Sequence, residues 1–275
     1  MKRSAAATIF VTLMLGSYGW AQTAGNAPSP KTATPEILIS AASSLTDVVT
    51  ALKPEAERRS GAKILLNFGA SGSLRAQIES GAPVDLFFSA SGIDMDRLQK
   101  GGFIEPGSRK DVLTNSMVLI GDRASGAKAD TTAGSIKDLT VLRSLLAGAT
   151  LLAIGNPDTV PAGQYSMQAL DSLGLSSLVE GKLVYGGNVR QVLQYVSSGA
   201  APLGIVFKTD ALTLPPSGDT VILFEFPLSA SEIPRYPIAV MASSKHKDAA
   251  ARAAAYLAGP EAAQAFARAG FGTTP

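Results

Sequence analysis

Strand-like apolar runs alternate with amphipathic helical patterns from Glu36 to the end of this 275-residue chain. In the first repeat, an apolar run at 37–39 is followed by apolar residues at helical spacing over 45–56, and Gly61 then ends the pattern. Because helices carry a chain back between parallel strands, this alternation predicts an α/β fold with mainly parallel sheets flanked by helices.

The same alternation continues along the chain. Helices are predicted to end near Gly81 and Gly101, and the Ala-rich C-terminus is predicted to form two helices that Pro260 separates. Further strands are expected at 64–68, 84–88, 151–154, 183–185, 202–207, 221–226 and 238–241.

The composition changes at 115–135, where an apolar strand runs into a long segment rich in Gly, Ala and Thr. We interpret this change as the passage into a second lobe, and a Pro-rich stretch at 233–237 as the return. The predicted first lobe comprises 36–120 and 236–275, and the predicted second lobe comprises 121–235. Two crossings form a two-strand hinge, and the cleft between two such lobes is a common ligand site.

The N-terminus has the pattern of a secretory signal. Two basic residues precede an apolar stretch at 5–16, and small residues that end at Ala21 predict a cleavage site there. We therefore expect a signal peptide at 1–21, a disordered linker at 22–35 and a periplasmic location. The apolar stretch is short for a membrane span and no cysteine is present to carry a lipid, so the exported protein is not expected to be membrane-anchored.

Removal of the signal leaves no excess of basic charge. The formal net charge of the full chain is +2, and the two excess charges are Lys2 and Arg3. Nucleic acid is therefore not an expected partner. We expect the exported protein to be a monomer.

The sequence shows no recognisable cluster of residues that move protons, attack a substrate or hold a metal. The single histidine, His246, is interpreted as solvent-exposed. The segment GASGS at 69–73 departs from the nucleophile motif G-x-S-x-G in the position of its second Gly. The chain is therefore predicted to be no enzyme and to need no cofactor. A periplasmic serine hydrolase that uses Ser71 stays an alternative.

Four strand-to-helix junctions have no Lys, Arg or His at the turn, and each should place unpaired helix N–H groups at the carboxyl end of a strand. Ser44 and Ser71 stand at the first two junctions, and Ala162 and Val189 stand at the other two. Taken singly, each Ser is also explained as a helix N-cap, and Ala162 and Val189 offer only a backbone N–H. Together, the four junctions favour an anion site made of neutral donors.

Several longer motifs contain these junctions and extend between them. They are AASSLTD (41–47), FGASGSL (68–74), RAQIESGAPVDLFFSAS (75–91), GNPDTVPAGQYSMQAL (155–170), NVR (188–190) and APLGIVFKTDA (201–211). In this order they resemble the periplasmic molybdate-binding proteins of ABC importers, which have the two-lobed type II periplasmic binding protein fold. The resemblance covers nearly all of 36–275.

The resemblance implies a ligand-binding role for each junction. Ser44 and Ser71 would offer hydroxyl and backbone donors from the first lobe. Ala162 and Val189 would offer backbone N–H groups from the second lobe. Molybdenum would be bound only as its oxyanion, with no direct ligand from the protein to the metal.

One position of the implied site departs from the family pattern. Many relatives have Tyr where this chain has Phe207, whose side chain cannot donate a hydrogen bond. Tyr165, Tyr185 and a bound water are the candidates to replace the missing hydroxyl, and the sequence does not decide whether any of them does. Arg190, next to Val189, is implied not to touch the ion.

The resemblance also implies a function. The protein would capture molybdate or tungstate in the cleft between its lobes and deliver the ion to an ABC permease and its ATPase. The same fold binding sulfate, phosphate or another small oxyanion is an alternative, because selectivity depends on the dimensions of the cavity. A module for adhesion or protein interaction is a further alternative, and it predicts no ligand-dependent change in stability.

Overall fold

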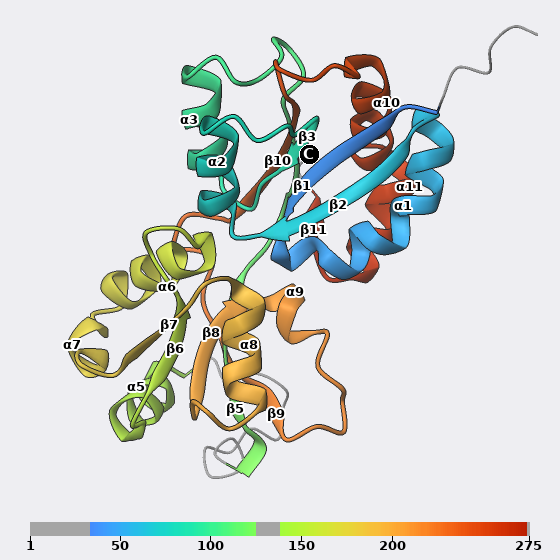
Figure 1. The fold of residues 1–275 in the computed structure, drawn as a ribbon. Coiled ribbons are helices and arrows are strands. Elements are labelled where there is room, and N and C mark those ends of the chain that lie inside the picture. The colour runs from blue at the N-terminus through green and yellow to red at the C-terminus, as the bar shows by residue number, and fades with distance from the viewer. Residues whose placement is uncertain (1–33, 125–137, 274–275) are drawn as a thin grey trace, which may run out of the picture. The chain divides into compact units, whose positions relative to one another are not determined.

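Two mixed β-sheets covered by helices organise residues 34–124 and 138–273, which are the residues that this computed structural model describes (Figure 1). The predicted signal peptide and nearly all of the predicted linker lie outside the described residues, as does most of the Gly/Ala/Thr-rich segment after the first crossing.

The first sheet has six strands in the described residues, in the order β11-β4-β10-β3-β1-β2. Strand β1 pairs in parallel with β2 and β3, whereas β10 runs antiparallel between β3 and β4. The strands are β1 (Glu36–Ala42), β2 (Lys63–Gly69), β3 (Leu86–Phe88), β4 (Lys110–Thr114), β10 (Arg235–Val240) and β11 (Gly272–Thr273).

Helices cover both faces of this sheet (Figure 1). Successive strand residues point to opposite faces, and the two Phe residues of β3 show the consequence. Phe88 packs edge-on against Phe266 of α11 at a ring distance of 5.9 Å, whereas Phe87 belongs to a separate cluster with Leu74 and Met95. The helices are α1 (Thr46–Ser60), α2 (Ser71–Glu79), α3 (Gly92–Lys100), α10 (Lys247–Leu257) and α11 (Pro260–Arg268).

The second sheet has five strands in the described part of the chain, in the order β7-β6-β8-β5-β9. Strand β6 pairs in parallel with β7 and β8, whereas β5 runs antiparallel to β8 and β9. The strands are β5 (Met117–Asp122), β6 (Leu152–Gly155), β7 (Leu183–Gly186), β8 (Leu203–Phe207) and β9 (Thr220–Glu225).

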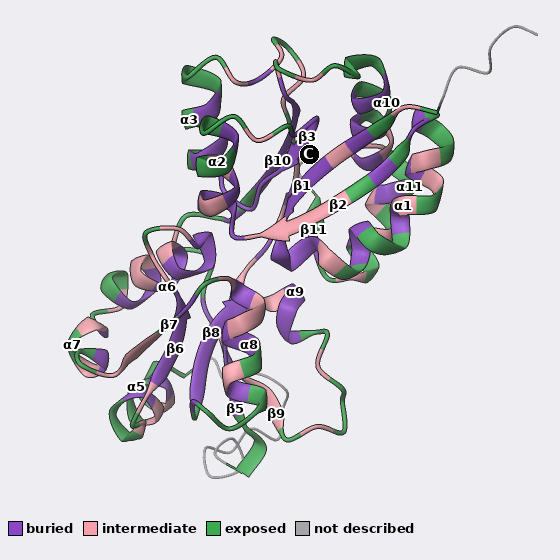
Figure 2. Ribbon diagram, viewed as in Figure 1, coloured by how far each residue is buried: buried purple, intermediate pink, exposed green. Residues whose placement is uncertain are grey.

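Every residue of β6 and β8 is buried, because α6 and α8 both pack against these two strands (Figure 2). None of the helices built from the described residues has the length and apolar character needed to cross a membrane. The helices of this half are α5 (Leu139–Gly148), α6 (Pro161–Ser172), α7 (Ser176–Val179), α8 (Val189–Ser197) and α9 (Lys208–Ala211).

The predicted α/β fold class is confirmed, with a difference in strand direction. Both sheets are mixed rather than mainly parallel, because the strands next to the crossings, β5 and β10, run opposite to their neighbours. Gly61 ends α1 as predicted, with a φ of 69° that favours glycine. The sequence interpretation did not include β4, β11, α5, α7 or α9.

The chain passes between the two sheets twice, and the two passages are hydrogen-bonded to each other. The backbone N–H of Asn115, between β4 and β5, donates to the carbonyl of Pro234 at 3.1 Å. The first passage lies before the predicted boundary at 120, because Met117–Asp122 already pairs with β8 and β9. Below, the first lobe is the part built on β1–β4, β10 and β11, and the second lobe is the part built on β5–β9.

Gly163 permits the close packing of α6 on the end of β6. A Cβ at this position would lie 2.0 Å from the carbonyl oxygen of Gly155. We expect Gly163→Ala to lower the free energy of unfolding by about 1–3 kcal/mol, because the helix must move away from the strand. Urea denaturation measures this change.

Gly148→Ala is the matched control, because Gly148 also lies in a helix and a Cβ there meets nothing within 4 Å. This variant should be as stable as the parent or more stable by up to about 1 kcal/mol. Equal stability of the two variants would contradict the packing argument.

Candidate functional site

The residues predicted at the four junctions lie where strands of the two sheets end and helices begin. Ser44 is in a 3₁₀ turn, η1 (Ser43–Leu45), directly after β1, and Ser71 is the first residue of α2 after β2. Ala162 is the second residue of α6 after β6, and Val189 is the first residue of α8 after β7. All four are at most 4% exposed.

Neither serine acts as a helix N-cap, so that interpretation of the junctions is not supported. Ala70 is the N-cap of α2 and Val160 is the N-cap of α6, and neither has a side-chain cap hydrogen bond. At α8 the Asn188 side chain accepts from the N–H of Gln191, which leaves Val189 uncapped. Ser71, Ala162 and Val189 therefore keep first-turn N–H groups that have no acceptor within their own helices.

The hydroxyl of Ser71 is fixed by the backbone of the next loop. Its Oγ accepts a hydrogen bond from the N–H of Ala90 at 2.9 Å. A hydroxyl that accepts in this way still has its own proton to donate. Ser71 thus keeps both a side-chain O–H and a backbone N–H as donors.

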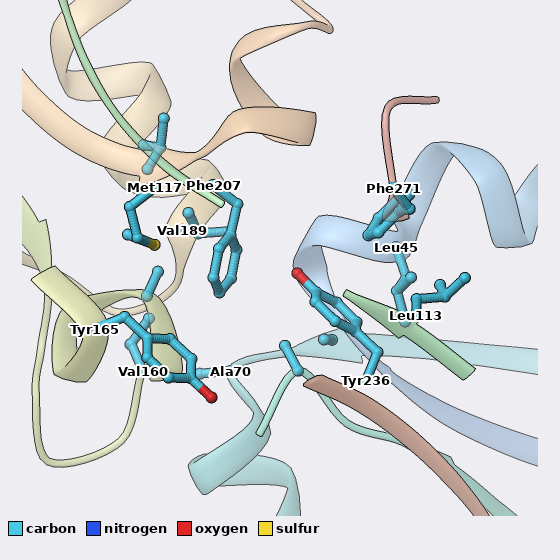
Figure 3. Packing of buried hydrophobic residues seen from close by; sticks show 14 of the residues in the cluster. Leu45, Ala70, Leu113, Met117, Val160, Tyr165, Val189, Phe207, Tyr236 and Phe271 are labelled. Carbon is cyan, nitrogen blue, oxygen red and sulfur yellow. The ribbon is translucent and has the colours of Figure 1, made fainter. Parts of the chain in front are cut away.

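The lobes touch next to these junctions. The N–H of Gly72, in the first turn of α2, donates to the carbonyl of Thr159, just before α6, at 3.0 Å. In Figure 3 Ala70 of the first lobe lies in one cluster with Val160, Val189 and Phe207 of the second. The structure therefore brings the starts of α2, α6 and α8 together, and η1 packs against α8.

Phe207 ends β8 and is buried between two tyrosines from different elements (Figure 3). Its ring centroid lies 6.2 Å from that of Tyr165 and 5.9 Å from that of Tyr236. Of the two tyrosines named from the sequence, Tyr165 is therefore adjacent to Phe207. Tyr185 is 51% exposed on β7.

Sequence reasoning missed Tyr236 and Asn115. The Tyr236 hydroxyl lies 3.0 Å from Ser44 Oγ and 3.0 Å from Asn115 Nδ2. Asn115 lies in the first crossing and Tyr236 at the start of β10, where the sequence signal was only a change of composition and a Pro-rich stretch. Their burial and their contact are not visible in the sequence, because 121 positions separate the two residues.

Burial keeps both tyrosine hydroxyls protonated. Burial raises the pKa of Tyr165, and a nearby N–H of Arg235 opposes that rise. Burial also raises the pKa of Tyr236 well above its usual value, against the effect of its hydrogen bonds to Ser44 and Asn115. Each phenol therefore has a proton to donate at neutral pH.

Arg190, the cation nearest the predicted site in sequence, is paired with two carboxylates. Its Nη2 lies 2.6 Å from Asp47 Oδ2 of the first lobe, and its Nε lies 2.5 Å from Asp210 Oδ1 of the second. The guanidinium is thus committed to the protein rather than presented to a ligand. The Asp47 bond also joins the lobes.

Asp210 is fully buried beside this pair. Burial raises the pKa of its carboxyl to about 7, and the charge of Asp47 adds to the rise while Arg190 opposes it. Arg190, Ser44, Asp47 and Arg268 help to line a small cavity of about 110 Å³. Within the described residues, no group of three or more His, Asp or Glu side chains is placed to hold a metal ion.

The profile of the family of bacterial extracellular solute-binding proteins matches residues 37–272 of this chain. The molybdate-binding protein ModA of Escherichia coli (strain K12) is 36% identical over 237 residues, which are 86% of this chain and 88% of that protein.

Solved structures agree with this match at the level of the fold. The periplasmic molybdate-binding protein of Azotobacter vinelandii superposes with a TM-score of 0.72 at 25% identity, over 87% of this chain and all of that one. The sulfate-binding protein SubI of Mycobacterium tuberculosis H37Rv superposes with a TM-score of 0.70 at 18% identity, over 86% of each chain. The fold alone therefore does not distinguish molybdate from sulfate.

The buried carboxyl of Asp210 should give the protein a specific dependence of stability on pH. Its pKa is about 7 in the folded protein, against an ordinary value of 3.8. Between about pH 4 and about pH 7 the folded state holds a proton that the unfolded chain releases, so this group makes the free energy of unfolding fall as pH rises. We expect Asp210→Asn to flatten that part of the curve in urea denaturation.

Thr209→Val is the control, because it alters the neighbouring buried residue without removing a titrating group. This variant should keep the slope of the parent protein. An unchanged slope in Asp210→Asn would show that Arg190 holds the carboxylate ionised throughout this range.

Proposed function

Because the chain belongs to the family of bacterial extracellular solute-binding proteins, we propose that it captures molybdate or tungstate between its two lobes for an ABC importer. The observation that carries the proposal is the convergence of buried, uncharged donors from both lobes near one charge-neutralised arginine. Proteins of this family are the binding components of transporters that also contain a permease and an ATPase. The chain is accordingly no enzyme, and the oxyanion is cargo rather than a cofactor.

In this proposal the hydroxyl and backbone groups of Ser44 and Ser71 bind the ion from the first lobe. The backbone N–H groups of Ala162 and Val189 bind it from the second. The burial of all four and the absence of side-chain caps at Ser71 and Ala162 support the assignment. The charge of the dianion is then balanced by dipoles at helix N-termini.

Phe207 offers the ligand no hydrogen bond at the fifth position. If one oxyanion oxygen had no hydrogen-bond donor there, the free energy of binding would be less favourable by about 1–3 kcal/mol. The hydroxyl of Tyr165, which is buried beside the Phe207 ring, is the replacement that the packing favours. The exposure of Tyr185 argues against the other tyrosine named from the sequence.

A binding site that contains only hydrogen-bond donors selects against oxyanions that carry a proton. Molybdate and tungstate have no proton at neutral pH, so every oxygen accepts. Hydrogenphosphate brings an O–H that needs an acceptor, and an unmatched polar group costs free energy. Sulfate has the same charge and shape as molybdate but is smaller, so it would lie too far from some of the donors.

Capture requires the lobes to move about the two crossings. We propose that an ion enters while the lobes are apart and that closure brings the second set of donors onto it. The Gly72 to Thr159 hydrogen bond and the Asp47 to Arg190 ion pair are the contacts that closure would form. The closed form would then be the one that the permease recognises.

The proposal extends to location and assembly. Export through a signal peptide at 1–21, followed by a linker at 22–35, would place a free monomer in the periplasm. The absence of cysteine from the chain supports an unanchored protein. The lobes would comprise 36–116 with 235–275, and 117–234, which follows the pairing of β5 and β10.

The hydrolase alternative finds little support in the geometry. The Ser71 hydroxyl is bonded to a backbone amide, and His246 is exposed near the start of β1 with Glu36 and Leu38. The seven residues of β1 separate that end from the Ser44 junction by about 20 Å. A serine-reactive probe that labelled Ser71 stoichiometrically would nevertheless contradict a pure binding role.

Calorimetry of the exported protein tests the ligand. We expect molybdate and tungstate to bind one ion per chain, with sulfate and phosphate far weaker. A ligand present at 100 times its Kd stabilises the folded state by about 2.7 kcal/mol, so thermal unfolding should shift by several degrees. Ser71→Ala should weaken molybdate binding, and Ser197→Ala, at an exposed serine of α8, should not.

Equal responses to molybdate and sulfate would favour the alternative in which the fold binds another oxyanion. No response to any of the four ions would favour an adhesion or interaction module.

Gly72→Ala tests closure. A Cβ on Gly72 would lie 2.6 Å from the carbonyl oxygen of Thr159 in the other lobe. We expect a loss of molybdate affinity of about tenfold or more, since overpacking costs about 1–3 kcal/mol, while thermal unfolding without ligand changes little. Gly92→Ala, at the start of α3 where a Cβ meets nothing within 4 Å, is the control.

Equal affinity of both glycine variants and the parent would show that the Gly72 contact takes no part in binding.

A further inference from the structure

A chain of buried hydrogen bonds leads from the crossings between the lobes to Ser44. Asn115 lies in the first crossing, and Tyr236 is the second residue of β10, directly after the second crossing. Tyr236 is fully buried and Asn115 is 6% exposed. Their side chains meet at 3.0 Å, and the Tyr236 hydroxyl continues to Ser44 Oγ at 3.0 Å. The direction in which each of these bonds donates can be deduced.

The amide of Asn115 has one possible orientation. Its Oδ1 lies 2.9 Å from the backbone N–H of Ser116, and a backbone N–H only donates. The Nδ2 group is therefore on the other side, where its two protons have two acceptors. These are Thr209 Oγ1 at 2.8 Å and the Tyr236 oxygen at 3.0 Å.

The orientation of the amide decides the orientation of the phenol. Because Asn115 donates to the Tyr236 oxygen, only donation from Tyr236 to Ser44 Oγ gives the phenol proton a partner among the described residues. Ser44 then accepts, and its own proton must find another acceptor. Among the described residues, Tyr236 is the only hydrogen-bond partner of that hydroxyl.

We propose that Asn115 and Tyr236 are positioning residues that commit the Ser44 hydroxyl to donating toward the bound oxyanion. This inference rests on the proposed function, in which Ser44 binds the ion. A Ser hydroxyl alone rotates and serves as donor or acceptor equally well. With Tyr236 donating to it, Ser44 cannot place its own proton on Tyr236 and accept from the ligand.

The consequence is selectivity against protonated ions. Hydrogenarsenate and hydrogenphosphate carry an O–H that would need Ser44 as an acceptor. The chain of bonds that begins at the Ser116 N–H makes Ser44 a donor instead. Asn115 lies in the first crossing and Tyr236 directly follows the second, so the selectivity is set next to the part of the protein about which the lobes move.

Tyr236→Phe removes the phenol proton and keeps the ring packing against Phe207 and Phe271. Calorimetric competition gives the ratio of molybdate affinity to arsenate affinity at neutral pH. We expect this ratio to fall about three- to tenfold, because Ser44 regains the freedom to accept. In a Ser44→Ala background the same change should alter molybdate affinity less than twofold, because the two residues act as a unit.

Asn115→Asp is the second variant, because it reverses the direction of donation along these hydrogen bonds while the side chain keeps nearly the same shape. A carboxylate must accept from Tyr236, so Tyr236 would accept from Ser44 and Ser44 would face the ligand as an acceptor. The added charge disfavours both anions, whereas the ratio reports the reversal and should fall further than in Tyr236→Phe. Thr209→Val removes the other acceptor of the same amide and should leave the ratio unchanged.

The outcomes separate the two proposals. If the parent protein binds molybdate but the ratio is unchanged in Tyr236→Phe and in Asn115→Asp, or if the effects of Ser44→Ala and Tyr236→Phe are additive, the positioning role is refuted while the proposed function stands. If the parent protein binds none of these ions, both are refuted.

Discussion

The first N–H groups of an α-helix have no acceptor inside the helix, and the candidate site follows from where the fold places those groups. Parallel strands end at a common edge, so β1 with β2 gathers η1 and α2, and β6 with β7 gathers α6 and α8. The crossings then turn the two edges toward each other, as the Gly72 to Thr159 bond shows. Backbone geometry alone thus assembles most of the donors.

The positive charge next to these donors is neutralised by ion pairs within the protein. Arg190 follows Val189 directly, yet its guanidinium is taken up by Asp47 and Asp210. One of these carboxylates is fully buried and the other belongs to the opposite lobe. A free cation at this position would attract any anion in proportion to its charge, whereas oriented dipoles respond to the position and protonation of each oxygen.

Features of the site that depend on neighbouring residues were predictable from the sequence. Features that depend on contacts between distant segments or on strand direction were not. The positions of Ser44, Ser71, Ala162 and Val189 follow from short strand-to-helix patterns. Tyr236 joins Asn115 across 121 positions of sequence, which no local pattern reports. The mixed sheets were missed for the same reason, because alternating strands and helices do not reveal the direction in which β5 and β10 enter. Cap preferences also misled, since Ala70 rather than a serine is the N-cap of α2.

The position of β10 in the first sheet affects the order in which the strands can pair during folding. This strand lies between β3 and β4, although it follows the whole second lobe in the chain. The facing edges of β3 and β4 therefore stay unpaired until about residue 240 is available, whereas β5–β9 form an uninterrupted stretch that can pair earlier. Pairings between distant segments are slow to form. A chain with this order of strands reaches its complete first sheet only near the end of its length, so a shorter segment of it leaves that sheet open between β3 and β4.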